Sequence, residues 1–355
     1  MRQMTHPYAA LESSAYWKTA VAEMGAFGVS GLWTPKFAIR PEHRIVTAGS
    51  CFAQHIGRAL AGRGYHWVDA EPAPPFLSEE DARRFNYGIF SFRTGNIYTP
   101  RMLAQWLDLA LDEAAPPAEV WQDADGRLRD PMRPVIEPEG FASRDDLVAA
   151  RRATCAAIRD AVTGADLFVF TLGLTESWID RESGLEYALC PGTAGGRFDP
   201  DRHDFNNAGF AETELHLTRV LDTLRAANPK LRVLLTVSPV PLTATASGEH
   251  VLTATQYSKS VLRAVAGETA RQADWIDYFP SFEIITHPVF GGMFYAPNAR
   301  SVVPQGVAFV MEHFFADQAR VFGAPEGPAA KSASGPRRTR TDIVCEEELL
   351  SVFSG

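Results

Sequence analysis

Three apolar, β-branched runs that each end in small polar residues constrain the fold more than any other feature of the chain. They are RIVTAG (44–49), ADLFVFTLG (165–173) and LRVLLTVSP (231–239), each the length of a buried strand. Helical spacing of apolar residues over 144–162 and 212–227 separates the runs. Strands that alternate with helices predict an α/β fold, a three-layer sandwich with a mostly parallel, doubly wound sheet covered on both faces.

Weaker patterns extend this architecture. Apolar residues at helical spacing follow the first strand over 52–60, and an amphipathic helix is expected at 15–24. WIDYFPSFEII (275–285) reads as a fourth strand that runs into a loop. PQGVAFVMEHFF (304–315) begins with a proline, which suits the first position of a helix, and so predicts a closing helix.

The distribution of residue types predicts one domain with two flanking parts. Residues 323–341 are rich in Pro, Gly, Ser, Ala and basic residues, which is typical of a linker. The stretch DIVCEEELLSVF that follows is short and amphipathic, and it docks back on the domain, binds a partner or is disordered. The expected parts are an N-terminal extension packed on the domain (1–43), the domain itself (44–322), the linker (323–341) and a C-terminal segment (342–355).

The bulk composition excludes several classes of protein. A net charge of -9 at pH 7 argues against nucleic-acid binding, which needs a basic surface. No apolar run approaches the ~18 residues of a transmembrane helix, and no secretion signal is visible, so we expect a cytoplasmic protein. The four cysteines lie far apart without CxxC spacing, which predicts neither a metal site nor a disulfide framework (Cys51, Cys155, Cys190, Cys345).

The first strand ends in a motif with two potential nucleophiles, Ser50 and Cys51, which follow Gly49. A thiol in the first turn of a helix lies near the positive end of the helix dipole, so its pKa is expected to fall. The backbone N–H groups there can hold an oxyanion. The alternative is structural, with Cys51 as a small buried apolar residue and Ser50 as a helix N-cap.

Polar residues also follow the other predicted strands, where an open parallel sheet binds its ligands. Glu176 can orient a histidine or act as a general base, and Glu283 can support a histidine. A structural pairing of Glu283 with Lys259 or Arg263 is the alternative. The remaining strand-end candidates are small (Gly173, Thr175, Ser238).

Three of the nine histidines are candidates for the base. His55 lies one helical turn after Cys51, on the same face of the helix. His250 follows a loop that leaves the third strand, and His287 follows the fourth strand. For each of them a packing or solvated role is the structural alternative.

The motif GSCFA (49–53) resembles the naming motif of the GSCFA-domain family, a bacterial group related to the SGNH/GDSL hydrolases. The resemblance covers about residues 5–320 and implies an SGNH-hydrolase-like, flavodoxin-like fold. Further segments similar to the family stand in family order: WTPKF (33–37), AGSCFAQHIG (48–57), TGNIYTP (94–100), TLGLTESW (171–178), VSPVPL (237–242), YSKSVLR (257–263) and YFPSFEI (278–284).

The relation to SGNH hydrolases implies roles for several residues. Cys51, not Ser50, stands at the nucleophile position. Gly95, with Asn96 beside it, is the implied oxyanion-hole residue of the second motif. The third motif falls on Gly173 to Glu176, where Thr175 replaces the family's Asn.

The fourth motif of the SGNH hydrolases, Asp-x-x-His, is not conserved in this chain. Its spacing selects Asn298 and Ser301, ahead of the helix that begins at Pro304. Neither side chain accepts a proton at pH 7, so the usual Ser-His-Asp mechanism does not carry over.

These observations favour an acyl-transfer enzyme, an esterase or acyltransferase such as an acetyltransferase, that acts on a glycan or a small acylated metabolite. Cys51 would be the nucleophile, the amides of Cys51 and Gly95 with Thr175 the oxyanion hole, and an acyl-CoA or another thioester the donor, with no cofactor required. The alternative is a non-catalytic protein that binds carbohydrate or acyl groups. A redox sensor is less favoured, because no resolving cysteine lies near Cys51 in the sequence.

Overall fold

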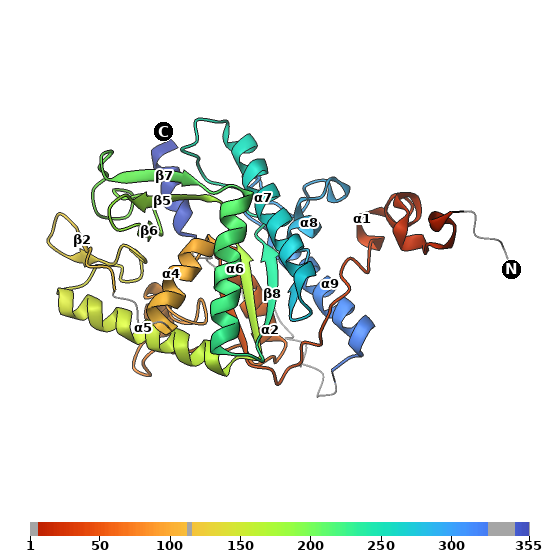
Figure 1. Ribbon diagram of the computed structural model, residues 1–355, viewed down its shortest axis with the longest axis horizontal. Helices are drawn as coiled ribbons and strands as arrows, with labels where there is room; N and C mark the ends of the chain where they lie inside the picture. Colours follow the sequence, from red (N-terminus) through yellow and green to blue (C-terminus); the bar gives the residue numbers. More distant parts are fainter. Residues whose placement is uncertain (1–5, 112–115, 326–344, 355) are drawn as a thin grey trace.

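The computed structural model describes residues 6–111, 116–325 and 345–354. Four parallel strands form the central sheet in the order β1-β4-β8-β9, namely Ile45–Gly49, Leu167–Leu172, Arg232–Val237 and Ile276–Tyr278. Strand β8 of this sheet is labelled near the middle of the molecule in Figure 1. Trp67 adds a parallel bridge to Ile45 on the outer side of β1. The chain therefore runs outward after β1 and returns to β4, which puts the topological switch point between these two strands.

Alternation of side chains along the strands builds two apolar layers. Val46, Phe168 and Leu235 pack on one face of the sheet, and Ile45, Val169 and Leu234 on the other. The first face is covered by α4 (Pro100–Leu111), α5 (Arg144–Gly164), α6 (Phe210–Ala227) and α7 (Val251–Gln272). The second is covered by α2 (Cys51–Gly62), α8 (Ser281–Thr286) and α9 (Pro304–Phe322). The expected α/β class with helices on both faces is confirmed.

Smaller elements surround this core. A three-stranded antiparallel sheet in the order β6-β5-β7 (Glu186–Tyr187, Glu176–Asp180, His203–Asn207) extends from the carboxyl end of β4. A two-stranded ribbon pairs β2 (Trp121–Gln122) with β3 (Leu128–Arg129). The short helices are η1 (Pro7–Ala10), η2 (Ser13–Ala15), η3 (Lys18–Ala22), α1 (Gly25–Gly28), α3 (Glu79–Arg84), η4 (Pro288–Phe290) and η5 (Glu346–Ser354).

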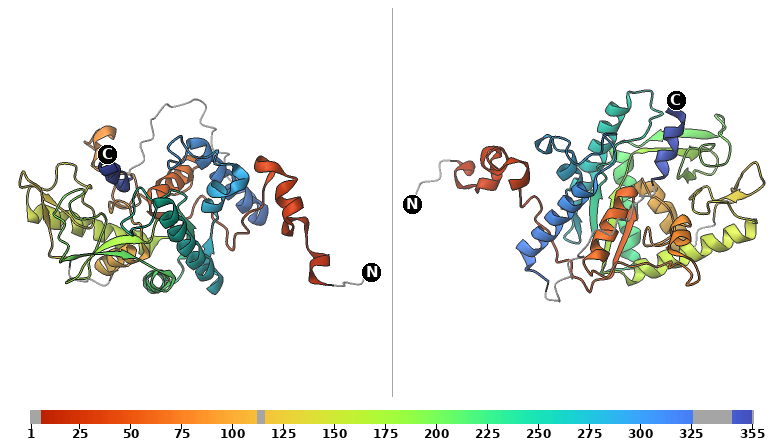
Figure 2. Two further views of the ribbon diagram at one scale, coloured as in Figure 1. Left: turned by 90° about the horizontal axis from the view of Figure 1, so that it is seen from above. Right: turned by 180° about the vertical axis from the view of Figure 1, so that it is seen from behind.

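The N-terminal prediction is wrong in detail. In place of one helix over 15–24, the chain forms the short turns η2, η3 and α1, which project to one side of the molecule (Figure 2). Trp17 and Phe27 remain largely exposed there. Residues 33–39 do pack on the domain, where Trp33 and Phe37 are buried.

Two further predictions need correction. The expected fourth strand over 275–285 is only three residues long, because Pro280 ends it and α8 begins at Ser281. Glu283 thus lies on a helix and not in a loop. Helix α7, which the sequence pattern did not single out, begins at Val251 directly after His250.

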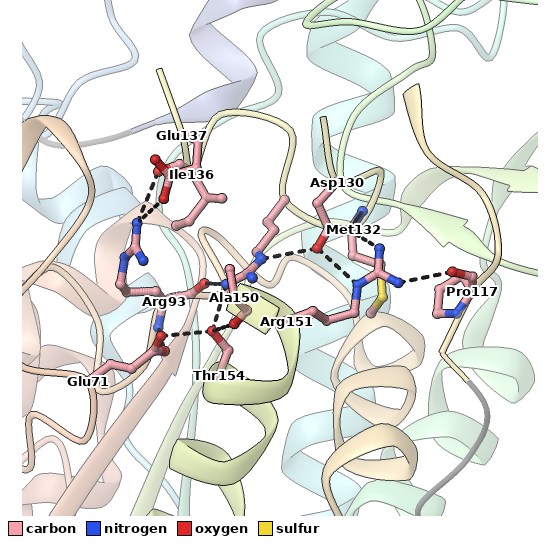
Figure 3. A network of polar contacts seen from close by, with 11 residues as sticks. Glu71, Arg93, Pro117, Asp130, Met132, Ile136, Glu137, Ala150, Arg151 and Thr154 are labelled. Atoms are coloured by element: carbon pink, nitrogen blue, oxygen red, sulfur yellow. Dashed lines mark hydrogen bonds and ion pairs between the residues drawn. The ribbon is translucent and has the colours of Figure 1, made fainter. Parts of the chain in front are cut away.

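A buried ionic network fixes the connection between the ribbon and α5 (Figure 3). The carboxylate of Asp130 is fully buried and lies 3.1 Å from Arg133 Nε and 2.7 Å from Arg151 Nη2. Arg133 also donates to Thr154 and to the backbone of Arg93. Because both cations hold the carboxylate, the pKa of Asp130 is lowered despite its burial.

No helix in the described ranges is long and apolar enough to cross a membrane. The linker prediction lies largely outside the described residues, as do positions 342–344 of the predicted C-terminal segment. Residues 345–354, here called the terminal segment, lie against the domain, as one of the sequence alternatives expected.

Candidate active site

The turn that carries the nucleophile candidates requires a glycine. Gly49 has φ +137°, and a Cβ there would lie 2.3 Å from the carbonyl oxygen of Thr171 on the neighbouring strand. With β1 and β4 packed this closely, the N–H of Ser50 donates to that same oxygen at 3.0 Å. The chain then enters α2 with Cys51 as its first residue. The sequence motif thus places a thiol at the helix N-terminus, at the carboxyl end of the sheet.

Ser50 occupies the N-cap position of α2 without acting as a hydrogen-bonding cap. Its hydroxyl accepts no bond from the helix, and the buried Oγ has no hydrogen-bond partner among the described residues. The structural alternative for Ser50, a place at the helix N-cap, is thus correct in position but not in a side-chain bond to the helix.

The Cys51 thiol is buried and meets a second thiol, that of Cys345 in the terminal segment. A hydrogen bond joins the two sulfurs. This bond and burial raise the pKa of Cys51, whereas the pKa of Cys345 is lowered because it accepts that bond and lies 3.6 Å from Arg300 Nη2. The low pKa expected for Cys51 is thus not found while the terminal segment is in place.

The next residue of the terminal segment reaches the predicted oxyanion position. Glu346 accepts hydrogen bonds from the backbone and side chain of Asn96, and its Oε1 fills the space that a Cβ on Gly95 would need. The N–H of Ile97 donates to Gly49 O at 2.8 Å, which ties this loop to the Cys51 turn. Because Cys345 and Glu346 are consecutive residues, the terminal segment contacts the Cys51 thiol and these donors with neighbouring side chains.

Two cations that the sequence reasoning did not assign to the site lie beside Cys51. Arg300 pairs with Glu347 at 3.2 Å, and its charge partly opposes the rise in the pKa of Cys51. Lys259 is buried and donates to the carbonyl of Gly173; burial lowers its pKa to about 8. Arg300 stands inside the stretch that replaces Asp-x-x-His, and Lys259 lies on the buried face of α7, so the sequence did hold a signal for each.

Glu347 joins the terminal segment to the rest of the site. Its N–H donates to the Tyr98 hydroxyl at 3.3 Å, and its Oε1 accepts from the Thr243 N–H at 3.3 Å. Burial raises its pKa, which Arg300 and Lys259 oppose. The Glu347 carboxyl therefore compensates the positive charges of Arg300 and Lys259.

The three candidate histidines do not meet the thiol. The His250 and His287 rings each accept a backbone N–H of the helix that follows, at 3.2 Å, and so act as N-caps. His55 packs by Phe52, and burial lowers its pKa to about 4. Within the described ranges no hydrogen bond or ion pair links a histidine to Cys51, so the expected histidine base has no support in the geometry.

The strand-end carboxylates have other partners. Arg263 and the Tyr278 hydroxyl both contact Glu283, which matches the structural alternative and not a role beside His250 or His287. Glu176 accepts from the Thr245 hydroxyl at 2.6 Å, and burial raises its pKa.

The small strand-end candidates also have hydrogen-bond partners of their own. The Thr175 hydroxyl donates to Asn207 at 2.7 Å and is thereby committed to β7. Ser238 Oγ accepts from the backbone of Val240 at 3.3 Å. Gly173 contributes its carbonyl to Lys259.

An apolar cavity of about 220 Å³ adjoins the site. The wall includes Tyr98, Leu174 and Trp178, and the terminal segment contributes Glu347 and Leu350. Ligand pockets for drug-sized molecules are commonly ~300–1,000 Å³, so this cavity fits a small group. Among the described residues no cluster of His, Cys, Asp and Glu could hold a metal ion.

The fold and the strand-end thiol define a class, that of α/β proteins with a cysteine after the first strand. The chain belongs to the GSCFA family, whose model matches residues 44–314. Among solved structures, a carbohydrate esterase family 3 protein from Talaromyces cellulolyticus is similar, at 13% identity and a TM-score of 0.27, over 63% of this chain and 90% of that one. A search of the curated proteins gave no match.

Proposed function

We propose that this protein is an acyl-transfer enzyme, an esterase or acyltransferase, with Cys51 as its nucleophile. The observation that carries the proposal is the convergence of a helix N-terminus and two cations, Lys259 and Arg300, around one buried thiol. Positive charge favours the thiolate, which is the reactive form of cysteine. In this arrangement the cations stabilise a thiolate that has already lost its proton to solvent, so that no histidine base has to accept the proton during the attack.

Groups around the thiol are candidates for the remaining parts that an acyl-transfer site needs. In the first step the Cys51 sulfur attacks the acyl carbon, and the carbonyl oxygen gains negative charge. The N–H donors at Asn96, which hold the Glu346 carboxyl here, are suited to hold that oxygen. The leaving group departs with a proton, for which Lys259 is a suitable donor because of its pKa of about 8. Water or an acceptor hydroxyl then attacks the acyl carbon and gives its proton to the now neutral Lys259 amine. The bond between the acyl carbon and sulfur breaks, which returns Cys51 as a thiolate and Lys259 as an ammonium.

The substrate class follows from the donors and the cavity. A thiolate exchanges acyl groups readily with a thioester, which makes an acyl-CoA a suitable donor. The small apolar cavity beside the site is suited to a short acyl group. A glycan or a small metabolite is the proposed acceptor.

The second candidate function is a non-catalytic protein that binds carbohydrate or acyl groups. The observation in its favour is that no histidine in the described ranges is a partner of Cys51.

Intact-protein mass spectrometry after incubation with acetyl-CoA, and separately with an activated acetyl ester, tests this function. We expect one acetyl adduct on Cys51 that is absent in Cys51→Ala and present in Ser50→Ala. Lys259→Met should slow its formation, whereas Lys230→Met, at an exposed position, should not. The reaction is also run in Glu347→Lys, which places a third cation beside Arg300 and Lys259. An adduct on Ser50 would contradict the assignment of Cys51 as the nucleophile. The absence of an adduct in every variant would also contradict it and would favour the non-catalytic binding protein.

A further inference from the structure

The terminal segment fills the candidate site with three consecutive side chains. Cys345 is hydrogen-bonded to the Cys51 thiol, and Glu346 takes the N–H donors at Asn96. Glu347 then reaches Arg300 at 3.2 Å. The thiol, the N–H donors at Asn96 and Arg300 are therefore each already in contact with a residue of the terminal segment.

Glu346 resembles an acyl group in its chemistry as well as in its position. Burial raises its pKa to about 8, so at neutral pH it is largely a neutral carboxyl. Its Oε1 lies at Gly95, while its buried Oε2 has no hydrogen-bond partner among the described residues. A neutral carboxyl resembles a substrate when its C=O accepts hydrogen bonds from the N–H groups that would hold the carbonyl of an ester.

Occupation also closes the route to the thiol. Only 5% of the Cys51 surface is exposed. The adjoining cavity is lined by Glu347 and Leu350 of the terminal segment and does not reach Cys51. An acyl donor therefore has to displace the terminal segment before its carbonyl carbon can meet the sulfur.

Displacement leaves two cations to be compensated. With the terminal segment in place, the side chain of Arg300 is 14% exposed and Lys259 is 3% exposed, and Glu347 supplies negative charge to both cations. Removal of one partner from a buried ion pair is strongly unfavourable. An incoming ligand that brings its own anionic group restores the balance, whereas an uncharged ligand does not.

We propose that the terminal segment is an intramolecular competitive ligand of the Cys51 site, and that the substrate which displaces it carries a carboxylate or similar anionic group at the place of Glu347. The description of that ligand as a substrate rests on the proposed function. The position of the terminal segment does not.

The position is tested by the rate at which iodoacetamide alkylates Cys51 in the full chain, followed by peptide mass spectrometry. Glu347→Lys sets an ammonium against Arg300 and Lys259 and should raise this rate at least about tenfold. The control is Val352→Lys, at a position of the same segment that is 78% exposed, and it should leave the rate unchanged. Equal rates in wild type and Glu347→Lys, or equal acceleration by both variants, would overturn the inference.

The anionic requirement is tested on Cys345, which becomes reactive when the terminal segment leaves, even if a ligand covers Cys51. Monomethyl succinate, an ester with a free carboxylate, should accelerate alkylation of Cys345 in the wild type. Dimethyl succinate, its uncharged counterpart, should not do so at equal ionic strength. Equal effects of the two esters would refute the requirement.

The two hypotheses fail in different ways, because alkylation reports the segment whether or not Cys51 is ever acylated. Rapid alkylation of Cys51 in Glu347→Lys without any acyl adduct contradicts the proposed function alone. An adduct that forms equally fast in wild type and Glu347→Lys, with equal alkylation rates, contradicts the inference alone.

Discussion

The protonation of the Glu346 carboxyl depends on whether the terminal segment lies in the site. A glutamate in water has a pKa of 4.5, and burial raises that of Glu346 to about 8. The seated segment therefore binds a proton that the free segment has lost at neutral pH. The stabilisation that the neutral carboxyl provides is complete below pH 4.5, falls as the pH rises and is lost once the pH passes about 8.

Glu346→Gln tests this dependence, because an amide has nearly the shape of the neutral carboxyl and does not ionise. We expect the wild type to lose stability relative to Glu346→Gln by up to about 1.4 kcal/mol for each pH unit within this window. Thermal unfolding of both proteins from pH 5 to pH 9 measures the difference, and other titrating groups cancel. A difference that stays constant with pH would show that Glu346 does not change its protonation.

At the scale of single elements, the Asp130 network shows what positions α5 (Figure 3). One carboxylate from the turn after β3 holds Arg151 of the helix and Arg133 of its own turn, and all three side chains are nearly inaccessible to water. Arg133 continues to the backbone of Arg93, which lies just before the Gly95 loop. The network thus supports, from behind, the loop whose N–H groups hold Glu346.

Asp130→Asn should be strongly destabilising, because it leaves two buried guanidinium groups without a counter-charge. We expect a loss of about 3–5 kcal/mol in the free energy of unfolding, measured by urea denaturation. Asp204→Asn is the matched control, since Asp204 pairs with Arg181 at the surface, where both side chains are about half exposed. Its unfolding midpoint should hardly change. Similar small losses in both variants would mean that the buried network contributes no net stability.

At the scale of the whole molecule, the fold brings residues from opposite ends of the chain into contact. Cys51 follows the first strand and Cys345 comes after the last long helix, yet the two thiols are hydrogen-bonded. Cys345 is the more exposed of the two and has the lower pKa. An oxidant is therefore expected to react first at Cys345.

Diamide should link the two cysteines. The Cys345 thiolate adds to the reagent, and the Cys51 sulfur then displaces the adduct, so that the protein loses two hydrogen atoms and the diazene becomes a hydrazine. We expect a single Cys51–Cys345 disulfide in peptide maps, absent in Cys345→Ser, with Cys155 and Cys190 still free. Preferential pairing of Cys155 or Cys190 would contradict the arrangement.

The sequence by itself determined the elements that depend on local pattern. The runs at 45–49, 167–172 and 232–237 are strands because continuous apolar residues suit a sheet buried on both faces. The motif around Gly49 and Cys51 predicts a strand, a tight turn and a helix. The turn needs a glycine at position 49, because a Cβ there would collide with the backbone of Thr171. The GSCFA motif (49–53), together with the further segments in family order, also predicted the family.

Only the tertiary structure decided what surrounds the thiol. Sequence distance from Cys51 or from the strand ends singles out three histidines, but spacing along a chain does not fix distances between separate loops. Lys259, Arg300 and Glu347 meet because α7, the turn before α9 and the terminal segment converge at one edge of the sheet. Burial then lowers the pKa of Lys259 and raises that of Glu347, and burial is a property of the packed molecule that no short stretch of sequence contains.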